Sequence, residues 1–145
     1  MTPSGASSSL HSCLSQPLHR TGALCTKLAR EHNVPLGRAL DIGCAVGATS
    51  FELSKDFQEV LGIDFSHAFV NAAKDMKNKG SATYSATIEG SIKHVFTAQL
   101  EAGVHPERTS FEQGDACALR SDIDASGKFS IVHGANLLCR LPEPM

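Results

Sequence analysis

Three carboxylates and one glycine-containing turn are the residues of this chain whose types and spacing could do chemistry. The segment LDIGCAVG, residues 40–47, places Asp41 two residues before Gly43 and ends at Gly47. Asp64 closes the apolar stretch EVLGI, and Asp115 stands in QGDACAL, residues 113–119. Carboxylates accept hydrogen bonds from ammonium, hydroxyl and amino groups. The pattern therefore indicates a site for a polar small molecule.

The turn departs from the motif of dinucleotide-binding proteins, G-x-G-x-x-G, in which glycines let the backbone approach a pyrophosphate. The corresponding residues here are Gly43, Ala45 and Ala48, so the second and third glycines are absent. S-adenosylmethionine has no phosphate; its amino group suits Asp41, and its carboxylate suits the N–H groups of a helix N-terminus. The turn therefore favours S-adenosylmethionine over NAD as the ligand.

The two later aspartates fit the nucleoside part of the same ligand. Asp64 could accept hydrogen bonds from both ribose hydroxyls, a role that it would share with NAD enzymes, and Asp115 could accept from the exocyclic amine of adenine. Ordinary turn chemistry is the alternative for Asp115, because Gly-Asp often marks a turn. We expect the three acids to meet in one crevice at adjacent strand ends.

Alternating strands and helices must position these residues. Apolar stretches predict strands over residues 39–42, 59–63, 109–113 and 129–133, and helical spacing predicts helices from residue 22 towards Asn33 and over 48–57, 66–79 and 90–102. In the second helix Phe51 and Leu53 should face the sheet, and Ser66 should cap the third. The pattern predicts an α/β fold, a Rossmann-like parallel sheet with flanking helices on both faces.

Several apolar or polar residues have a plain structural interpretation. Phe65, Phe69, Ala72 and Met76 are expected to face the core. Cys44 lacks an acid–base partner nearby in the sequence and fits a tight turn because it is small. His133, at a strand end, could steer a methyl acceptor, but packing at the strand terminus is the favoured interpretation.

Composition excludes other classes of protein. The chain has 145 residues, 41% of them apolar, which suits one domain or a piece of one. Its net charge is −2, so nucleic acid is not an expected partner. Apolar runs are too short to cross a bilayer. Five scattered cysteines without a C-x-x-C pair suggest no metal site and a reducing, cytoplasmic setting. Residues 1–20, Ser-rich and without periodicity, are expected to be a mobile lead-in to residues 21–145.

The chain resembles the class I S-adenosylmethionine-dependent methyltransferases through LDIGCAVG, GIDFS, QGDAC and GANLLCRLPEP. Within that class it is most similar to the C-terminal methyltransferase domain of ovothiol biosynthesis enzymes, the 4-mercaptohistidine N1-methyltransferase family, over residues 36–144. The resemblance implies methyl transfer to the imidazole of 5-thiohistidine. It implies that Asp41, Gly43 and Gly47 hold the methionine end, that Asp64 and Phe65 hold the ribose and adenine, and that Asp115 and Ala116 hold the adenine edge.

The resemblance also implies that Asn136 faces the methyl-transfer site; Asn136 and His133 are the candidates for catalysis, and no base is assigned. The complete set expected to bind the cofactor is Asp41, Gly43, Cys44, Ala45, Gly47, Asp64, Phe65, Asp115, Ala116 and Asn136.

The chain departs from this family in length. About four of the family's seven strands are expected, in the order 3-2-1-4, which leaves the fourth strand as an edge that invites pairing with a partner chain. Three functions therefore remain open: a working methyltransferase acting on a small molecule such as thiohistidine, a cofactor-binding or regulatory fragment without catalysis, and an NAD-type oxidoreductase. A smaller departure is Gly134, where the family tends to carry alanine.

Overall fold

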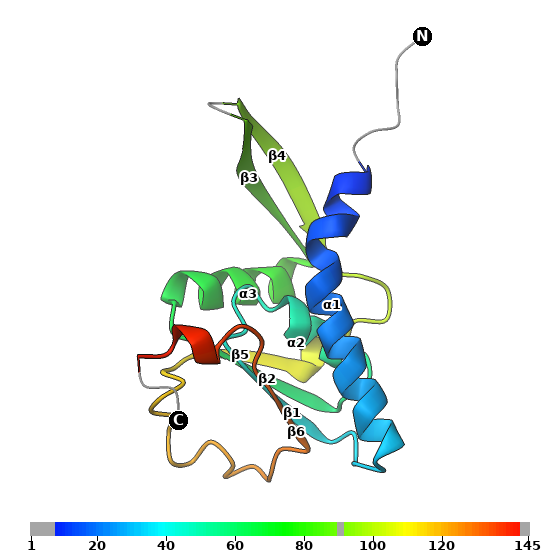
Figure 1. Ribbon diagram of the computed structural model, residues 1–145, viewed down its shortest axis with the longest axis vertical. Helices are drawn as coiled ribbons and strands as arrows, with labels where there is room; N and C mark the ends of the chain where they lie inside the picture. Colours follow the sequence, from blue (N-terminus) through cyan, green and yellow to red (C-terminus); the bar gives the residue numbers. More distant parts are fainter. Residues whose placement is uncertain (1–7, 90–91, 143–145) are drawn as a thin grey trace.

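A four-stranded parallel sheet forms the centre of the computed structural model, which describes residues 8–89 and 92–142. Its strands are β1 (Arg38–Ile42), β2 (Glu59–Asp64), β5 (Thr109–Gln113) and β6 (Ile131–His133). They lie in the order β5-β2-β1-β6 (Figure 1). The predicted α/β class and the order 3-2-1-4 are both confirmed, because the chain moves outward from β1 through β2 to β5 and then returns to β6 on the other side.

Three helices cover one face of this sheet: α1 (Ser8–Glu31), α2 (Ala48–Leu53) and α3 (His67–Lys79). Alternation along the strands turns Ala39, Val60 and Phe111 towards this layer. Ala39 and Val60 pack with α1 and α2, whereas Phe111 packs with α2 and α3. Phe51 and Leu53 are buried as predicted.

The opposite face is covered by a non-helical segment. Leu40, Leu61 and Ile63 point to this side and pack against three apolar residues of the connection between β5 and β6, which are Leu119, Ile123 and Phe129. The expectation of helices on both faces is therefore wrong for the described residues. The β5–β6 connection is rich in Asp, Ser and Gly, which favour turns over helix.

An antiparallel hairpin replaces the helix predicted over residues 90–102. It consists of β3 (Ser81–Glu89) and β4 (Ile92–Gln99) and projects away from the sheet (Figure 1); residues 90–91 lie outside the described residues. Ile92, Val95, Phe96 and Leu100 have helical spacing, but the stretch is also rich in β-branched and aromatic residues. Tyr84 and Phe96 are opposite each other with ring centroids 5.6 Å apart, a cross-strand pair that favours the hairpin.

Helix α1 begins at Ser8, well before residue 22, so the secondary structure predicted for this stretch is wrong at its N-terminal end. Residues 1–7 lie outside the described residues, and the division of the chain at residue 20 stays a prediction. No helix within the described ranges is long and apolar enough to span a membrane. Two short 3₁₀ helices, η1 (Pro106–Arg108) and η2 (Leu138–Arg140), complete the described elements.

Ser66 caps α3 as predicted, since its side chain accepts a hydrogen bond from the Phe69 N–H at 3.4 Å. Replacing Ser66 with alanine leaves that N–H without its acceptor, and we expect the free energy of unfolding to fall by about 0.5–1 kcal/mol. Urea unfolding measures the change. The Ser66→Asp variant, which restores an acceptor, should recover most of the loss; equal stability of the alanine variant and the parent would contradict the assignment.

Candidate functional site

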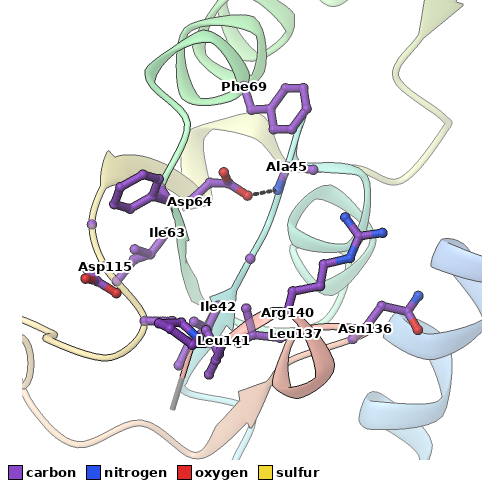
Figure 2. Close-up of a pocket in the computed structure, with 16 residues that line it drawn as sticks. Ile42, Ala45, Ile63, Asp64, Phe69, Asp115, Asn136, Leu137, Arg140 and Leu141 are labelled. Atoms are coloured by element: carbon purple, nitrogen blue, oxygen red, sulfur yellow. Dashed lines mark hydrogen bonds between the residues drawn. The ribbon is translucent and has the colours of Figure 1, made fainter. Parts of the chain in front are cut away.

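A pocket of about 600 Å³ lies at the carboxyl ends of all four strands of the sheet. Figure 2 shows its lining side chains. Segments that directly follow the strands form its walls, as the strand-end rule for parallel sheets predicts. These are Ile42, Gly43 and Ala45 at the end of β1 and after it, Ile63, Asp64 and Phe65 at the end of β2, Gly114, Asp115 and Ala116 after β5, and Ala135, Asn136 and Leu137 after β6, with Phe69, Arg140, Leu141 and Pro142 alongside.

The turn between β1 and α2 folds back over the end of β2. Gly43, Ala45 and Gly47 have left-handed backbones with φ of 75°, 47° and 88°. The N–H groups of Gly43 and Cys44 both donate to the carbonyl of Ile63, at 2.7 and 3.0 Å, and that of Gly47 donates to the carbonyl of Cys44 at 2.8 Å. The turn is thus tied to β2 by its own backbone.

Asp64 holds this turn and the start of α3 at once. Its Oδ2 accepts from the N–H of Ala45 at 2.8 Å (Figure 2) and its Oδ1 accepts from the N–H of Ser66 at 2.9 Å. Each carboxylate oxygen can accept a second hydrogen bond. Asp64 is half-buried and lines the pocket, so it presents two oriented acceptors to a ligand.

Asp115 combines the two roles that the sequence left open. Its Oδ1 accepts from the N–H of Cys117 at 2.8 Å, which is an Asx turn, and the side chain also lines the pocket. Ala116 lines the pocket beside it. The turn uses one lone pair of Oδ1, so both carboxylate oxygens can still accept from a donor on a ligand.

Two phenylalanines predicted to lie in the core instead line the pocket. Phe65 is 72% exposed and Phe69 is 48% exposed. The core-facing residues of α3 are Val70 and Ala73, so the helix presents a neighbouring stripe to the sheet and leaves Phe69 at the pocket. The core prediction is wrong for Phe65 and Phe69, while Met76 does pack against the core.

Asp41, predicted to meet the ligand's amino group, is not among the lining residues. Its carboxylate is 1% exposed and turns towards the helix layer, where Oδ1 is 2.8 Å from His133 Nδ1 and Oδ2 accepts from Ser50 Oγ at 2.6 Å. The imidazole N–H donates in this pair, since an ionised carboxylate only accepts. His133 is 9% exposed and, like Asp41, lies behind the pocket wall.

Cys44 and Gly47 also lie outside the lining, in the layer between sheet and helices. Burial raises the pKa of the Cys44 thiol far above its usual range, and the charges of Asp41 and Asp64 raise it further. A raised pKa keeps the thiol protonated, and the thiolate is the nucleophile. We therefore expect iodoacetamide at pH 8 to modify the exposed Cys117 and Cys139 in the folded chain and to spare Cys44.

Peptide mass spectrometry measures this alkylation, with the urea-unfolded chain as the control in which Cys44 reacts. Rapid modification of Cys44 in the folded chain would contradict its placement.

Asn136 completes the wall that follows β6. It has φ of 53°, a left-handed conformation that asparagine tolerates better than most residues, and it lines the pocket. The same wall contains residues without a predicted role, namely Ala135, Leu137, Arg140, Leu141 and Pro142. The motif GANLLCRLPEP covers this segment, but the segment has no helical or strand periodicity from which to predict the side chains that face the pocket. The last residues of the motif, 143–144, lie outside the described residues.

Charge is distributed unevenly around the pocket. Asp64 and Asp115 lie towards one side, and Arg140 extends on the other (Figure 2). Among the described residues no group of three His, Cys, Asp or Glu side chains could hold a metal ion. The lining therefore suits an organic ligand that carries donors at one end and an anionic group at the other.

The methyltransferase domain family model matches residues 40–144. Three solved structures share the fold. The YcgJ protein from Bacillus subtilis is 23% identical with a TM-score of 0.57, over 86% of this chain and 41% of that one. The methyltransferase domain of bacterial CtHen1-CN is 16% identical with a TM-score of 0.57, over 86% and 53%.

The third is magnesium protoporphyrin IX methyltransferase from Synechocystis PCC 6803 with bound SAM, 18% identical with a TM-score of 0.57, over 97% of this chain and 54% of that one. The chain therefore spans about half of each solved structure, or less. No curated protein matches it.

Proposed function

The chain belongs to the methyltransferase domain family, and from this premise we propose that its pocket binds S-adenosylmethionine and serves methyl transfer to a small-molecule acceptor. Bound S-adenosylmethionine would supply an electrophilic methyl group on a sulfonium, which an acceptor nitrogen attacks as the carbon–sulfur bond breaks. The protein's own part would be to hold both partners in line and to exclude water, a positioning effect.

The observation that carries the proposal is that N–H groups of the turn between β1 and α2 already donate to acceptors within the protein. A pyrophosphate-binding turn points free N–H groups at its ligand. Here the N–H groups of Gly43, Cys44 and Gly47 donate to carbonyl oxygens, and that of Ala45 donates to Asp64. A phosphate at this turn would meet N–H donors that are already paired, and the nearby negative charge of Asp64. These four paired N–H groups therefore disfavour NAD and are compatible with a ligand that lacks phosphate.

The pocket's residues fit the parts of S-adenosylmethionine. Asp64 would accept from the two ribose hydroxyls, and Asp115 and Ala116 would border the adenine. Phe65 and Phe69 offer apolar surface to the base. Arg140, on the other side of the pocket, is the lining cation that suits the ligand's carboxylate, a role that the paired N–H groups named above cannot fill. The volume lies within the range of small-molecule sites.

For the acceptor we propose the imidazole of 5-thiohistidine. The support is the resemblance of LDIGCAVG, QGDAC and GANLLCRLPEP to the 4-mercaptohistidine N1-methyltransferase family. A neutral imidazole nitrogen is nucleophilic and abundant near neutral pH, so the reaction needs no dedicated base; the product loses its N–H proton to solvent. Asn136, which lines the pocket, would face the reacting groups. A partner chain pairing with β6 belongs to the same proposal.

The test is to incubate the chain with S-adenosylmethionine labelled in its methyl group and with 5-thiohistidine, histidine or no acceptor. We expect labelled N-methyl-5-thiohistidine by mass spectrometry and little product from histidine. Binding of S-adenosylmethionine without transfer to any acceptor would instead identify a cofactor-binding module, and absence of binding by a folded chain would contradict the cofactor.

A further inference from the structure

The buried pair Asp41–His133 joins the neighbouring strands β1 and β6, and a wall of the pocket follows the end of each. The two residues are register partners, the last pair of the parallel ladder between β1 and β6. Their side chains meet at 2.8 Å with exposed fractions of 1% and 9%. At this burial water does not compete for the carboxylate, so the hydrogen bond to it is strong and directional.

We propose that Asp41 and His133 are positioning residues: their bond sets the separation of the β1 and β6 walls of the pocket and thereby the affinity for ligand. The ligand readout rests on the proposed function, whereas the wall itself can be measured without ligand.

The short length of β6 explains why this bond matters for the wall that follows it. The strand is only three residues long, and its ladder with β1 contains the pairs Ala39–Ile131, Leu40–Val132 and Asp41–His133. Lining residues begin one residue after Asp41, at Ile42, and two residues after His133, at Ala135. The side-chain bond therefore acts at the point where the ladder ends and the pocket begins.

The walls that follow β1 and β6 are in contact, so a small movement of one wall changes the shape of the pocket. A Cβ atom on Gly43 would lie 3.2 Å from Leu137 Cδ1, so the β6 wall already packs closely on the turn. Asp64 is bonded to Ala45 of the turn after β1, and Asn136 and Arg140 lie in the wall after β6. A ligand held by both groups needs the two walls within a fraction of an ångström of their native places. A small outward movement of residues 135–142 would lower the affinity without unfolding the sheet.

Variants at His133 separate positioning from bulk stability. In His133→Leu the donor is lost; in His133→Asn the amide N–H stands at the same number of bonds from the backbone as the imidazole Nδ1–H and can still donate to Asp41. The matched control is Ile131→Ala, which weakens the packing of the same strand against the core but leaves the pair intact.

All titrations use S-adenosylmethionine well below each variant's melting temperature. We expect His133→Leu to bind on the order of tenfold more weakly or worse, His133→Asn to recover most of the loss, and Ile131→Ala to bind within about twofold of the parent. If His133→Leu does not fold, His133→Gln replaces it. The glutamine amide lies one bond further from the backbone than the imidazole Nδ1, so it is not placed to donate to Asp41 as Nδ1 does. Equal affinity of the leucine and asparagine variants would overturn the proposal, as would an equal loss in Ile131→Ala.

Hydrogen exchange supplies the ligand-free readout. The Arg140 N–H donates to the Leu137 carbonyl at 2.9 Å and reports the order of the β6 wall. We expect it to exchange faster in His133→Leu and at the parental rate in His133→Asn and Ile131→Ala. This result stands even if the parent fails to bind S-adenosylmethionine, in which case the proposed function fails and the positioning role does not. Identical exchange in all four proteins would overturn the role itself.

Discussion

Replacing Asp64 with alanine is expected to weaken binding of S-adenosylmethionine on the order of 10- to 100-fold. The two hydrogen bonds from ribose hydroxyls to this carboxylate are lost, a net loss of about 1.5–3 kcal/mol for the pair because water rehydrates the freed hydroxyls. The variant also releases the N–H groups of Ala45 and Ser66, which Asp64 holds at 2.8 and 2.9 Å, so the turn that borders the ligand loses its anchor. Calorimetric titration measures the change in affinity.

The matched control for this prediction is Asp75→Ala on the exposed side of α3. Asp75 pairs with Lys79 at 3.5 Å, in solvent and outside the pocket lining, so its removal changes net charge equally but should leave the affinity unchanged. An Asp64→Ala protein that folds and binds S-adenosylmethionine as tightly as the parent would contradict the ribose role of Asp64.

Replacing Gly47 with alanine is expected to lower the free energy of unfolding by about 2–4 kcal/mol. Gly47 precedes α2 with φ of 88°, a left-handed conformation that costs a residue with a Cβ atom about 1–2 kcal/mol. The new Cβ would also lie 2.8 Å from Phe111 Cζ and 3.1 Å from Phe51 Cε2, which the packed core can relieve only by moving a ring. Urea unfolding monitored by circular dichroism measures the loss.

Two further variants divide this loss into its causes. Gly80 also has a positive φ, 71°, but no atom lies within 4 Å of a Cβ built there, so Gly80→Ala should cost only about 1 kcal/mol. Adding Phe111→Leu to Gly47→Ala removes the ring atoms that clash, and the two changes together should cost less than the sum of the separate losses. A Gly47→Ala variant no less stable than Gly80→Ala would show that the turn does not pack on Phe111 as described.

The elements around the pocket could be predicted from the sequence because their signals are local. The strand predicted over residues 109–113 is correct at both ends, and the cap at Ser66 is correct because serine is a preferred N-cap residue. Asp64 and Asp115 followed predicted strands, and parallel topology alone brings strand ends together. Ile42 and Ile63 line the pocket for the same reason, although their strand-end positions were not used to predict it.

The direction of Asp41 could have been predicted but was not. Side chains alternate along a strand, so Asp41 shares a face with Ala39, which packs under the helices, and not with Leu40 or Ile42. Its partner, His133, is remote in the chain, and only the register of β1 with β6 brings the two together. The aspartate of the motif therefore suggested a ligand contact where the structure has a buried pair.

Hydrophobic periodicity could not predict that residues 92–99 form a strand or that Phe65 and Phe69 line the pocket. Helix α3 has apolar residues on two adjacent stripes, and only the packing of Val70 and Ala73 on the sheet determines that Phe69 remains outside. In the hairpin, Phe96 gains its partner Tyr84 from the other strand, a contact that no window along the sequence contains.

Titration of the purified chain with S-adenosylmethionine and, separately, with NAD tests the central claim most directly. Four N–H groups of the turn, those of Gly43, Cys44, Ala45 and Gly47, are paired internally, and Asp64, Asp115 and Arg140 surround one pocket. We therefore predict that S-adenosylmethionine binds at one site and that NAD does not. A folded chain that binds NAD, or that binds neither ligand, would contradict the claim.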